Sequence, residues 1–598
     1  MSPNPPPLQL DAPADEAQSR AAAAAFDSAF HARMAPLWGG LSPISLALAT
    51  MDWGLHLATQ PAQSMQLALR AGQAAARWWT DHLTQRDLNG DAGAAAGRPE
   101  DLRFSNPAWQ RWPYAPMVRA YLGAEQWWRE AASLRGMAPH HQEMARVFAR
   151  QWLDLLSPAN AGLANPEVLQ RTLASGGANL AQGLGNALDE WRVRHGLDPL
   201  HPPERPYQPG VDVAITPGQV VHRNALVELI QYAPATPSVH AEPVFIVPSW
   251  IMKYYILDLS PENSMVKWLV DQGHTVFILS WRNPDEGDAL LDMADYLELG
   301  IFDCLAAIAQ RVPGEAVHAA GYCLGGTLLS IAAAALARPG AVANAEQLPR
   351  LASVSMLAAE TDFSEPGEMG VLIDESQVAL LEDMMAERGF LTGPQMAGSF
   401  QFLHSRELIW SAKLREVWLG ERLRPNDLMA WNADVTRMPA AMHSEYLRRC
   451  YLRNELAESR YPVEGRPVAL ADIRTPIFLV GTEKDHVSPW KSVYKLHRLT
   501  DTELTFVLTN GGHNAGIVSE PGHAGRHYAM RTKVADGAWV PPEEWASGAE
   551  RHEGSWWTAW HGWLLGHGSG RTVPGRVIDA GDALCAAPGE NVLVRYND

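Results

Sequence analysis

The N-terminal third of the chain has the hydrophobic pattern of amphipathic helices. Between Ala21 and about Gly196, apolar residues recur at spacings of three and four, which gathers them on one face of a helix. The pattern therefore predicts a helical N-terminal domain over residues 21–205. Two proline-rich stretches bound it: residues 1–20, expected to form a disordered tail, and residues 199–209, expected to form a stiff connector.

Beyond the connector, short runs of β-branched and aromatic residues alternate with helical segments. The clearest runs lie at residues 244–247, 275–279, 317–320, 353–357, 477–480 and 504–508. Such alternation builds a mostly parallel sheet covered by helices on both faces. It predicts an α/β core formed by residues 206–361 and 475–598. The largely helical insertion between them, residues 362–474, is expected to form a lid.

Composition narrows the functional class. The chain has 48 Lys and Arg against 67 Asp and Glu, a net charge of −19, and no run of five cations, which argues against nucleic acid as a partner. Its four cysteines in 598 residues make neither a disulfide framework nor a CxxC metal pair. No charged n-region followed by an apolar stretch opens the sequence, so a cytoplasmic location is expected.

Residues 316–337 contain no charged side chain and are long enough to cross a bilayer. Three glycines interrupt this segment, so a strand that turns into a helix is a better interpretation. The turn reads Gly321-Tyr322-Cys323-Leu324-Gly325-Gly326, which places Cys323 where a nucleophile elbow holds its nucleophile. The alternative for Cys323 is a buried structural cysteine in a tight turn.

A nucleophile elbow predicts an acid after a later strand and a histidine after the last one. Asp485 follows the run at 477–480, and His513 follows the run at 504–508. Alone, each is a common loop residue, but together with Cys323 they form the expected order of a catalytic triad. Glu483 and His486, in the same loop as Asp485, remain rivals for the acid and the base.

Two backbone amides are candidates for an oxyanion hole. Leu324 follows the cysteine at a helix N-terminus, and Ile251 lies in the turn after the first predicted strand. Ile251 could equally be a turn hydrophobe that covers the sheet edge. A metal is not expected, because His523 and His527 lie among glycines and have no third ligand nearby.

The cysteine elbow, read with Trp250-Ile251-Met252-Lys253-Tyr254-Tyr255, Ser280-Trp281-Arg282-Asn283-Pro284-Asp285 and Gly554-Ser555-Trp556-Trp557, resembles the polyhydroxyalkanoate synthases. The resemblance covers about residues 104–563 and is greatest to the single-subunit class I enzymes. It implies an α/β-hydrolase fold with a helical lid and a helical N-terminal domain.

The resemblance also implies roles for individual residues. Cys323 would carry the acyl group, His513 would act as its base, and Asp485 would help to activate the 3-hydroxyl group. Asp285 and Trp431 match family positions near the active site. His486 is a further candidate for a substrate or CoA contact.

The sequence departs from the family pattern at two places. Met252 replaces a usual asparagine in the turn after the first strand, and the lid arginine that would face CoA is missing in register. Arg406 is expected to substitute for that arginine in contacting CoA.

The predicted function is polymerisation of (R)-3-hydroxyacyl-CoA into polyester with release of CoA, without a cofactor beyond the CoA of the substrate. The expected partners are that substrate, the growing chain and a polymer granule surface, and the protein is expected to be a homodimer. One alternative is a thioesterase or intracellular polyester depolymerase on the same fold, since the fold does not select the acceptor. A second is a non-catalytic granule-associated protein.

Overall fold

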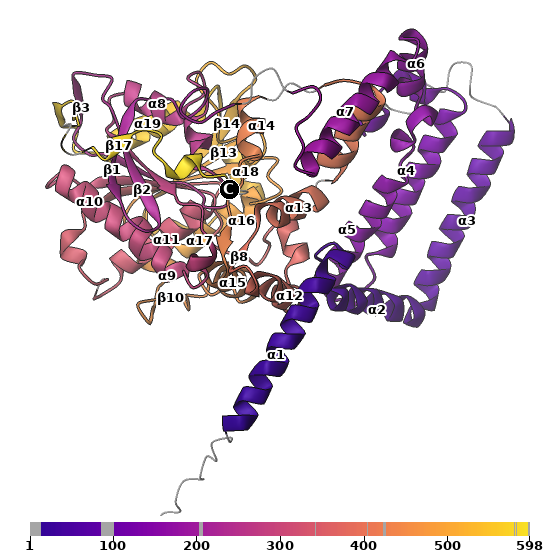
Figure 1. The fold of residues 1–598 in the computed structure, drawn as a ribbon, viewed down its shortest axis with the longest axis horizontal. Helices are drawn as coiled ribbons and strands as arrows, with labels where there is room; N and C mark the ends of the chain where they lie inside the picture. Colours follow the sequence, from indigo (N-terminus) through magenta and orange to yellow (C-terminus); the bar gives the residue numbers. More distant parts are fainter. Residues whose placement is uncertain are drawn as a thin grey trace, which may run out of the picture.

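The structure is a computed structural model with a helical N-terminal unit beside a unit built around a large sheet (Figure 1). It describes residues 14–84, 101–202, 207–340, 342–403, 405–422, 426–578, 581 and 583–595. Helix α1 projects away from both units at the lower edge of the view.

The N-terminal region is helical, as its hydrophobic pattern predicts. Its helices are α1 (Ala14–Met34), α2 (Pro43–Thr59), α3 (Pro61–Thr84), α4 (Tyr114–Ala131), α5 (Pro139–Leu155), α6 (Pro166–Ala174) and α7 (Ala178–Arg194). The expectation of a disordered tail is wrong for residues 14–20, which belong to α1. Strong helix formers (Ala, Glu, Gln and Arg) follow Pro13 without a breaker, which explains the early start. Residues 1–13 and the connector residues 203–206 lie outside the described part.

The sheet contains all six predicted strands at its centre. They are β4 (Val244–Val247), β5 (Val276–Trp281), β6 (Val317–Tyr322), β7 (Leu351–Leu357), β12 (Ile477–Thr482) and β13 (Leu504–Thr509). These strands pair in parallel in the order β13-β12-β7-β6-β4-β5. The carboxyl ends of β6, β12 and β13 therefore meet at one edge, where the candidate residues lie.

Antiparallel strands that the sequence pattern did not predict extend both sides of the sheet. They are β1 (Gly218–Arg223), β2 (Val227–Tyr232), β14 (His527–Lys533), β15 (Glu550–Glu553) and β17 (Cys585–Ala586). The exposed positions of β14 and β15 give them a polar composition, which hides them from a search for apolar runs.

Alternating strand residues feed two hydrophobic cores, one on each face of the sheet. On β5, Phe277 and Leu279 face one core, whereas Val276 and Ile278 face the other. Helices α10 (Asp303–Arg311) and α11 (Leu324–Ala337) cover the first face, and α8 (Met265–Asp271) and α19 (Trp556–Gly566) cover the second. The fold is therefore the three-layer arrangement expected for an α/β core.

The insertion between β7 and β12 is mostly helical. Its α-helices are α12 (Glu375–Ala386), α13 (Gly393–Leu403), α14 (Asp427–Asn432) and α15 (Ala440–Tyr446). It contacts the N-terminal helices as well as the sheet, since His31 of α1 lies 2.7 Å from the Asp383 carboxylate of α12.

No single helix in the described segments is long and apolar enough to cross a membrane. The helices Gln18–Trp38 and Pro43–Thr59, which are bent by 61° relative to each other, are long and apolar enough only when they are counted as one pair. The uncharged segment 316–337 divides into β6, Cys323 and α11, and most of α11 is buried in the core.

Four buried histidines make stability dependent on pH. Burial lowers the pKa of His274 to about 2 and that of His318, His443 and His497 to about 4. The unfolded chain therefore binds protons below about pH 6.5 that the folded chain excludes, so the free energy of unfolding is expected to fall as the pH decreases. Each histidine contributes up to about 1.4 kcal/mol per pH unit between its folded pKa and about 6.5.

Urea titrations at pH 7.5, 6.5 and 5.5 measure this dependence. His443→Leu is expected to flatten it by about one proton, and His527→Gln, at a histidine that is 46% exposed, serves as the control substitution. Equal unfolding free energies at pH 7.5 and 5.5 would contradict the prediction.

Candidate active site

Cys323 lies in a strained turn between β6 and α11, with φ of 52° and ψ of −125°. Such a conformation is rare for a residue with a Cβ atom. Close packing around the turn enforces it. A Cβ on Gly321 would lie 2.5 Å from the Cα of Gly326, and one on Gly325 would lie 2.1 Å from the carbonyl oxygen of Val247. The chain thus has the strand–turn–helix geometry of a nucleophile elbow.

The loop after β12 and the loop after β13 bring an acid and a histidine together. His513 Nδ1 lies 2.8 Å from Asp485 Oδ2. The same carboxylate accepts hydrogen bonds from the Thr482 hydroxyl, at 2.9 Å, and from the amides of Val487 and Ser488, at 2.9 and 2.8 Å. These donors fix the carboxylate, so the histidine it holds has one orientation.

The His513 side chain also lies beside Cys323, close enough for the two side chains to interact. Burial lowers the pKa of His513, but the Asp485 carboxylate and Cys323 outweigh burial and raise this pKa well above its ordinary value. Burial raises the pKa of Asp485, but the charge and hydrogen bond of His513 hold it below its ordinary value. A histidine with a raised pKa, held by a carboxylate beside a thiol, is suited to accept a proton as a general base.

The two rival residues lie elsewhere in the loop. The Glu483 carboxylate is 42% exposed and lies 3.9 Å from His527. His486 lines a cavity next to Asp485, and its backbone carbonyl accepts the amide of Glu368 at 3.1 Å. Asp485, rather than Glu483, is therefore the carboxylate that contacts His513.

The turn after β4 lies against the start of α11, because a Cβ on Gly325 would also lie 2.6 Å from the carbonyl oxygen of Pro248. Leu324 is the first residue of α11, where amides have no partner within the helix. The Ile251 amide points to the Ser249 hydroxyl at 3.4 Å, a long contact. The oxyanion role of Leu324 and Ile251 stays a prediction.

Two segments that are distant in sequence hold this turn, one around residues 431–436 and one around residues 591–594. The Trp431 indole of α14 donates to the Lys253 carbonyl at 2.7 Å, and the Thr436 amide donates to the Ile251 carbonyl at 3.0 Å. The Lys253 ammonium is buried and donates to the carbonyls of Asn591, at 3.2 Å, and Val594, at 2.6 Å. Trp431 thus contacts the turn after β4, and its role in substrate or CoA binding stays a prediction.

Sequence reasoning missed Thr436 and Glu360. The Thr436 hydroxyl donates to the carbonyl of Trp250, which adds a third bond between the insertion and the turn. Glu360 follows β7 and is 4% exposed, and burial together with the charges of Asp485 and Cys323 raises its pKa well above the ordinary value. A carboxyl group held neutral thus lies beside the candidate triad, and no motif in the sequence marks either residue.

Asp285 and Arg406 lie in contacts of their own. Asp285 caps the short helix Glu286–Asp288, and its carboxylate is 63% exposed. Arg406 donates to Asp154 at 2.7 and 2.9 Å and to Glu125 at 3.0 Å. Its guanidinium is therefore committed to carboxylates of the N-terminal helices, and a CoA contact by Arg406 stays a prediction.

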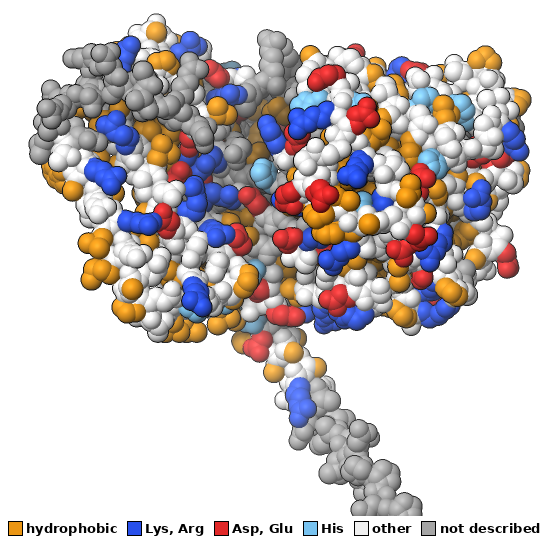
Figure 2. All heavy atoms as spheres, turned by 180° about the vertical axis from the view of Figure 1, so that it is seen from behind, with side chains coloured by type: hydrophobic (Ala, Val, Ile, Leu, Met, Phe, Trp, Pro, Cys, Tyr) orange, Lys and Arg blue, Asp and Glu red, His pale blue; other side chains and the backbone are white. Residues whose placement is uncertain are grey.

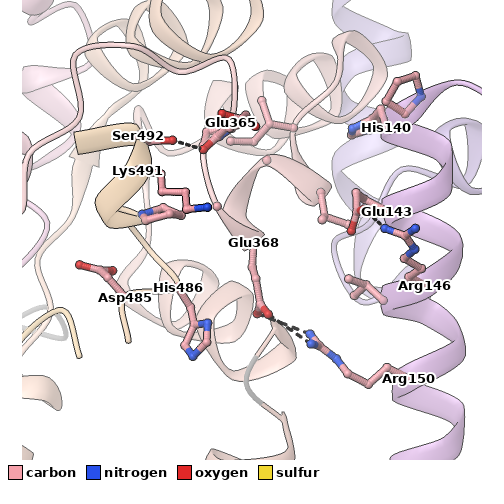
Figure 3. A pocket seen from close by; sticks show the side chains of 18 of the residues that line it. His140, Glu143, Arg146, Arg150, Glu365, Glu368, Asp485, His486, Lys491 and Ser492 are labelled. Carbon is pink, nitrogen blue, oxygen red and sulfur yellow. Dashed lines mark hydrogen bonds and ion pairs between the residues drawn. The ribbon is translucent and has the colours of Figure 1, made fainter. Parts of the chain in front are cut away.

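A cavity of about 1420 Å³ lies between the N-terminal helices and the core. Figure 3 shows Asp485 and His486 on one side and the α5 residues His140, Glu143, Arg146 and Arg150 on the other. The cavity therefore reaches the acid of the candidate triad.

Within the described residues, no group of three His, Cys, Asp or Glu side chains is arranged to hold a metal ion. His523 pairs with Glu520 at 2.6 Å, and His527 begins β14. The chemistry that the residues themselves support is nucleophilic catalysis by a thiol with a histidine base oriented by a carboxylate.

Three family models match the chain. Residues 100–269 match "Poly-beta-hydroxybutyrate polymerase (PhaC) N-terminus", residues 21–63 match "Poly-beta-hydroxybutyrate polymerase N terminal", and residues 242–520 match "alpha/beta hydrolase fold". Among solved structures, a monoacylglycerol lipase from Paleococcus ferrophilus is similar with a TM-score of 0.30 and 13% identity, covering 57% of this chain and 99% of the lipase.

Curated relatives are similar over most of their length. The poly(3-hydroxyalkanoate) polymerase of Methylorubrum extorquens is 37% identical over 539 residues, which covers 90% of this chain and 87% of the relative. The poly(3-hydroxyalkanoate) polymerase subunit PhaC of Cupriavidus necator is 35% identical over 511 residues, or 84% of each chain. The chain is therefore an enzyme of the poly(3-hydroxyalkanoate) polymerase family with an α/β-hydrolase fold.

Proposed function

We propose that this enzyme polymerises (R)-3-hydroxyacyl-CoA into polyester and releases CoA at each addition. The observation that carries the proposal is the strained Cys323 beside His513, whose imidazole lies 2.8 Å from the Asp485 carboxylate, in a chain of this family. A thiol nucleophile suits the task because a cysteinyl thioester keeps the activation of the CoA thioester.

The acylation step begins at the Cys323–His513 pair. His513 takes the thiol proton, and the thiolate attacks the carbonyl carbon of the substrate. The carbon–sulfur bond to CoA then breaks, and the proton on His513 passes to the CoA thiolate. The amide at the start of α11 and an amide of the turn after β4 stabilise the oxyanion between these events.

The elongation step uses the same groups in the opposite direction. His513 takes the proton of an attacking 3-hydroxyl group, the new ester bond forms, and the proton returns to the Cys323 sulfur as it leaves. Asp485 assists the hydroxyl group and orients His513. Water would compete with the hydroxyl group, so the insertion serves to cover Cys323 between additions.

The proposed product is an insoluble polyester, which offers an apolar surface for the protein to contact. The N-terminal helices carry exposed apolar side chains, which Figure 2 shows along the lower and outer edges of the helical unit. On α2, Ile44, Leu48, Met51 and Leu55 are 43–59% exposed at spacings of four, three and four, so they share one helix face. This face would lie on the polymer granule, and a homodimer is the proposed assembly.

Replacing the nucleophile tests the proposal directly. Cys323→Ala is expected to reduce CoA release from 3-hydroxybutyryl-CoA by roughly 10⁴-fold, because no other described group is placed to form the thioester. Cys585→Ser, at a partly exposed cysteine of β17, is the matched control and should keep most activity. Insoluble polymer as the product supports the synthase, whereas free 3-hydroxybutyrate would indicate a hydrolase. Release of CoA by the alanine variant at the wild-type rate would refute the role of Cys323.

The roles of Asp485 and His513 separate in single-turnover experiments. Asp485→Asn is expected to acylate Cys323 within about tenfold of the wild-type rate but to elongate roughly 100-fold more slowly, since the hydroxyl group loses the carboxylate that assists its attack. His513→Gln should lose both steps. If the two variants lose acylation equally, Asp485 only orients the histidine.

The hydrogen bond from the Thr436 hydroxyl to the Trp250 carbonyl is expected to affect kcat but not KM. Thr436→Val keeps the shape and removes the hydroxyl, so kcat is expected to fall about fivefold with KM unchanged, because a hydrogen bond of this kind contributes about 1 kcal/mol. Thr392→Val, which removes a hydroxyl within the insertion, provides the control for steady-state kinetics. A rise in KM alone would place Thr436 in substrate binding instead.

A further inference from the structure

The cavity between α5 and the core has walls from two parts of the chain. One wall is α5, and the other is formed by the short helix Glu368–Leu372 and the start of α16 (Trp490–Tyr494). Gly367, with φ of 66°, leads into the short helix, and a Cβ there would lie 2.6 Å from the His486 carbonyl oxygen. The wall that carries Glu368 is therefore packed directly on the loop that carries Asp485.

The CoA part of the proposed substrate carries phosphate groups that need a binding site away from Cys323. While its thioester lies at Cys323, the diphosphate and the 3′-phosphate of the CoA nucleotide lie at the far end of a flexible arm. These phosphates need cationic donors, for which the planar guanidinium of arginine is well suited because it binds phosphate oxygens in pairs.

Two arginines of α5 face the cavity from successive turns of the helix. Arg146 and Arg150 are four residues apart and therefore lie on the same helix face, and both are directed toward the cavity in Figure 3. Figure 2 shows that Lys and Arg side chains gather where the N-terminal helices face the core. On the opposite wall, Lys491 adds another cation.

Carboxylates now hold both arginines. Arg146 pairs with Glu143 of its own helix and bonds the Ser133 hydroxyl at 2.8 Å, and Arg150 forms a two-fold contact with Glu368 across the cavity at 3.2 and 3.4 Å. Arg150 and Glu368 are 34% and 27% exposed. Ion pairs with such access to water are weak, so a phosphate can replace the carboxylate.

We infer that the cavity between α5 and the core binds the CoA nucleotide of the substrate, with Arg150 and Arg146 as its phosphate ligands and Glu368 as a resident carboxylate that the phosphate displaces. This inference rests on the proposed function. Arg406 lines the same cavity, but its guanidinium bonds Asp154 and Glu125. The N-terminal unit then takes part in substrate binding.

If phosphate replaces the Glu368 carboxylate on Arg150, substitutions of these two residues should change KM in opposite directions. Arg150→Gln removes the phosphate ligand, so KM for 3-hydroxybutyryl-CoA is expected to rise about tenfold, as expected for loss of a charge-assisted hydrogen bond. Glu368→Gln removes the competitor, so this KM is expected to fall. A bridge that only holds the two units together would be broken by both variants and would move KM in the same direction.

A truncated substrate isolates the nucleotide. With the N-acetylcysteamine thioester of 3-hydroxybutyrate, which lacks phosphates, both variants should have the wild-type KM. Arg146→Gln keeps the contact between the units, since Arg146 bonds Glu143 and Ser133, and should also raise KM for the CoA thioester alone. Arg70→Gln breaks an exposed ion pair with Glu130 that does not line the cavity and should change neither KM.

Titration calorimetry with free CoA tests the site without chemistry. Binding to Arg150→Gln and to Arg146→Gln is expected to be about tenfold weaker than to the wild type. Equal affinity in all three proteins, parallel shifts in Arg150→Gln and Glu368→Gln, or an equal KM increase with the truncated thioester would each overturn the inference. Failure of the wild type to act on either thioester would instead refute the proposed function, and calorimetry would still decide whether CoA binds here.

Discussion

The N-terminus of α11 packs against the ends of β4 and β7 so closely that no side chain fits at two positions of its first turn, Gly325 and Gly326. Gly325 lies against the Val247 carbonyl, and Gly326 would place a Cβ 2.5 Å from that of Ala359. Because the helix cannot move away from the sheet, Cys323 is forced to positive φ. The strain at Cys323 thus follows from the packing of the whole core. The Cys323 sulfur is surrounded by His513, Asp485 and the turn after β4.

The N-terminal helices and the insertion are joined by buried charge. Asp154 of α5 is 1% exposed and accepts hydrogen bonds from Arg103, at 2.9 Å, and from Arg406, at 2.7 and 2.9 Å. Removing one partner of such a cluster leaves an uncompensated buried charge, which costs more than an exposed pair contributes. The N-terminal unit is therefore fixed relative to the insertion, and any movement of the insertion over Cys323 has to carry these contacts or break them.

The sequence predicted the features that depend on local pattern. The six central strands and the positions of Cys323, Asp485 and His513 follow from apolar runs and from the residues directly after them, and parallel pairing brings strand ends together without further information. Contacts between distant segments had no such signal. The bond between Arg406 and Asp154 spans 252 positions, and the polar strands β14 and β15 pair only because β13 offers them an edge. Glu360 looks like any polar residue after a strand, since its burial depends on what packs over it.

The contact between Lys253 and the segment Asn591–Val594 bears on how the protein is made. The buried ammonium group of Lys253 donates hydrogen bonds to the carbonyls of residues 591 and 594. During synthesis these residues leave the ribosome more than three hundred positions after Lys253. Until then the lysine lacks both acceptors and remains hydrated, so the turn beside Cys323 takes its final position after translation has passed residue 594 rather than while the chain is being made.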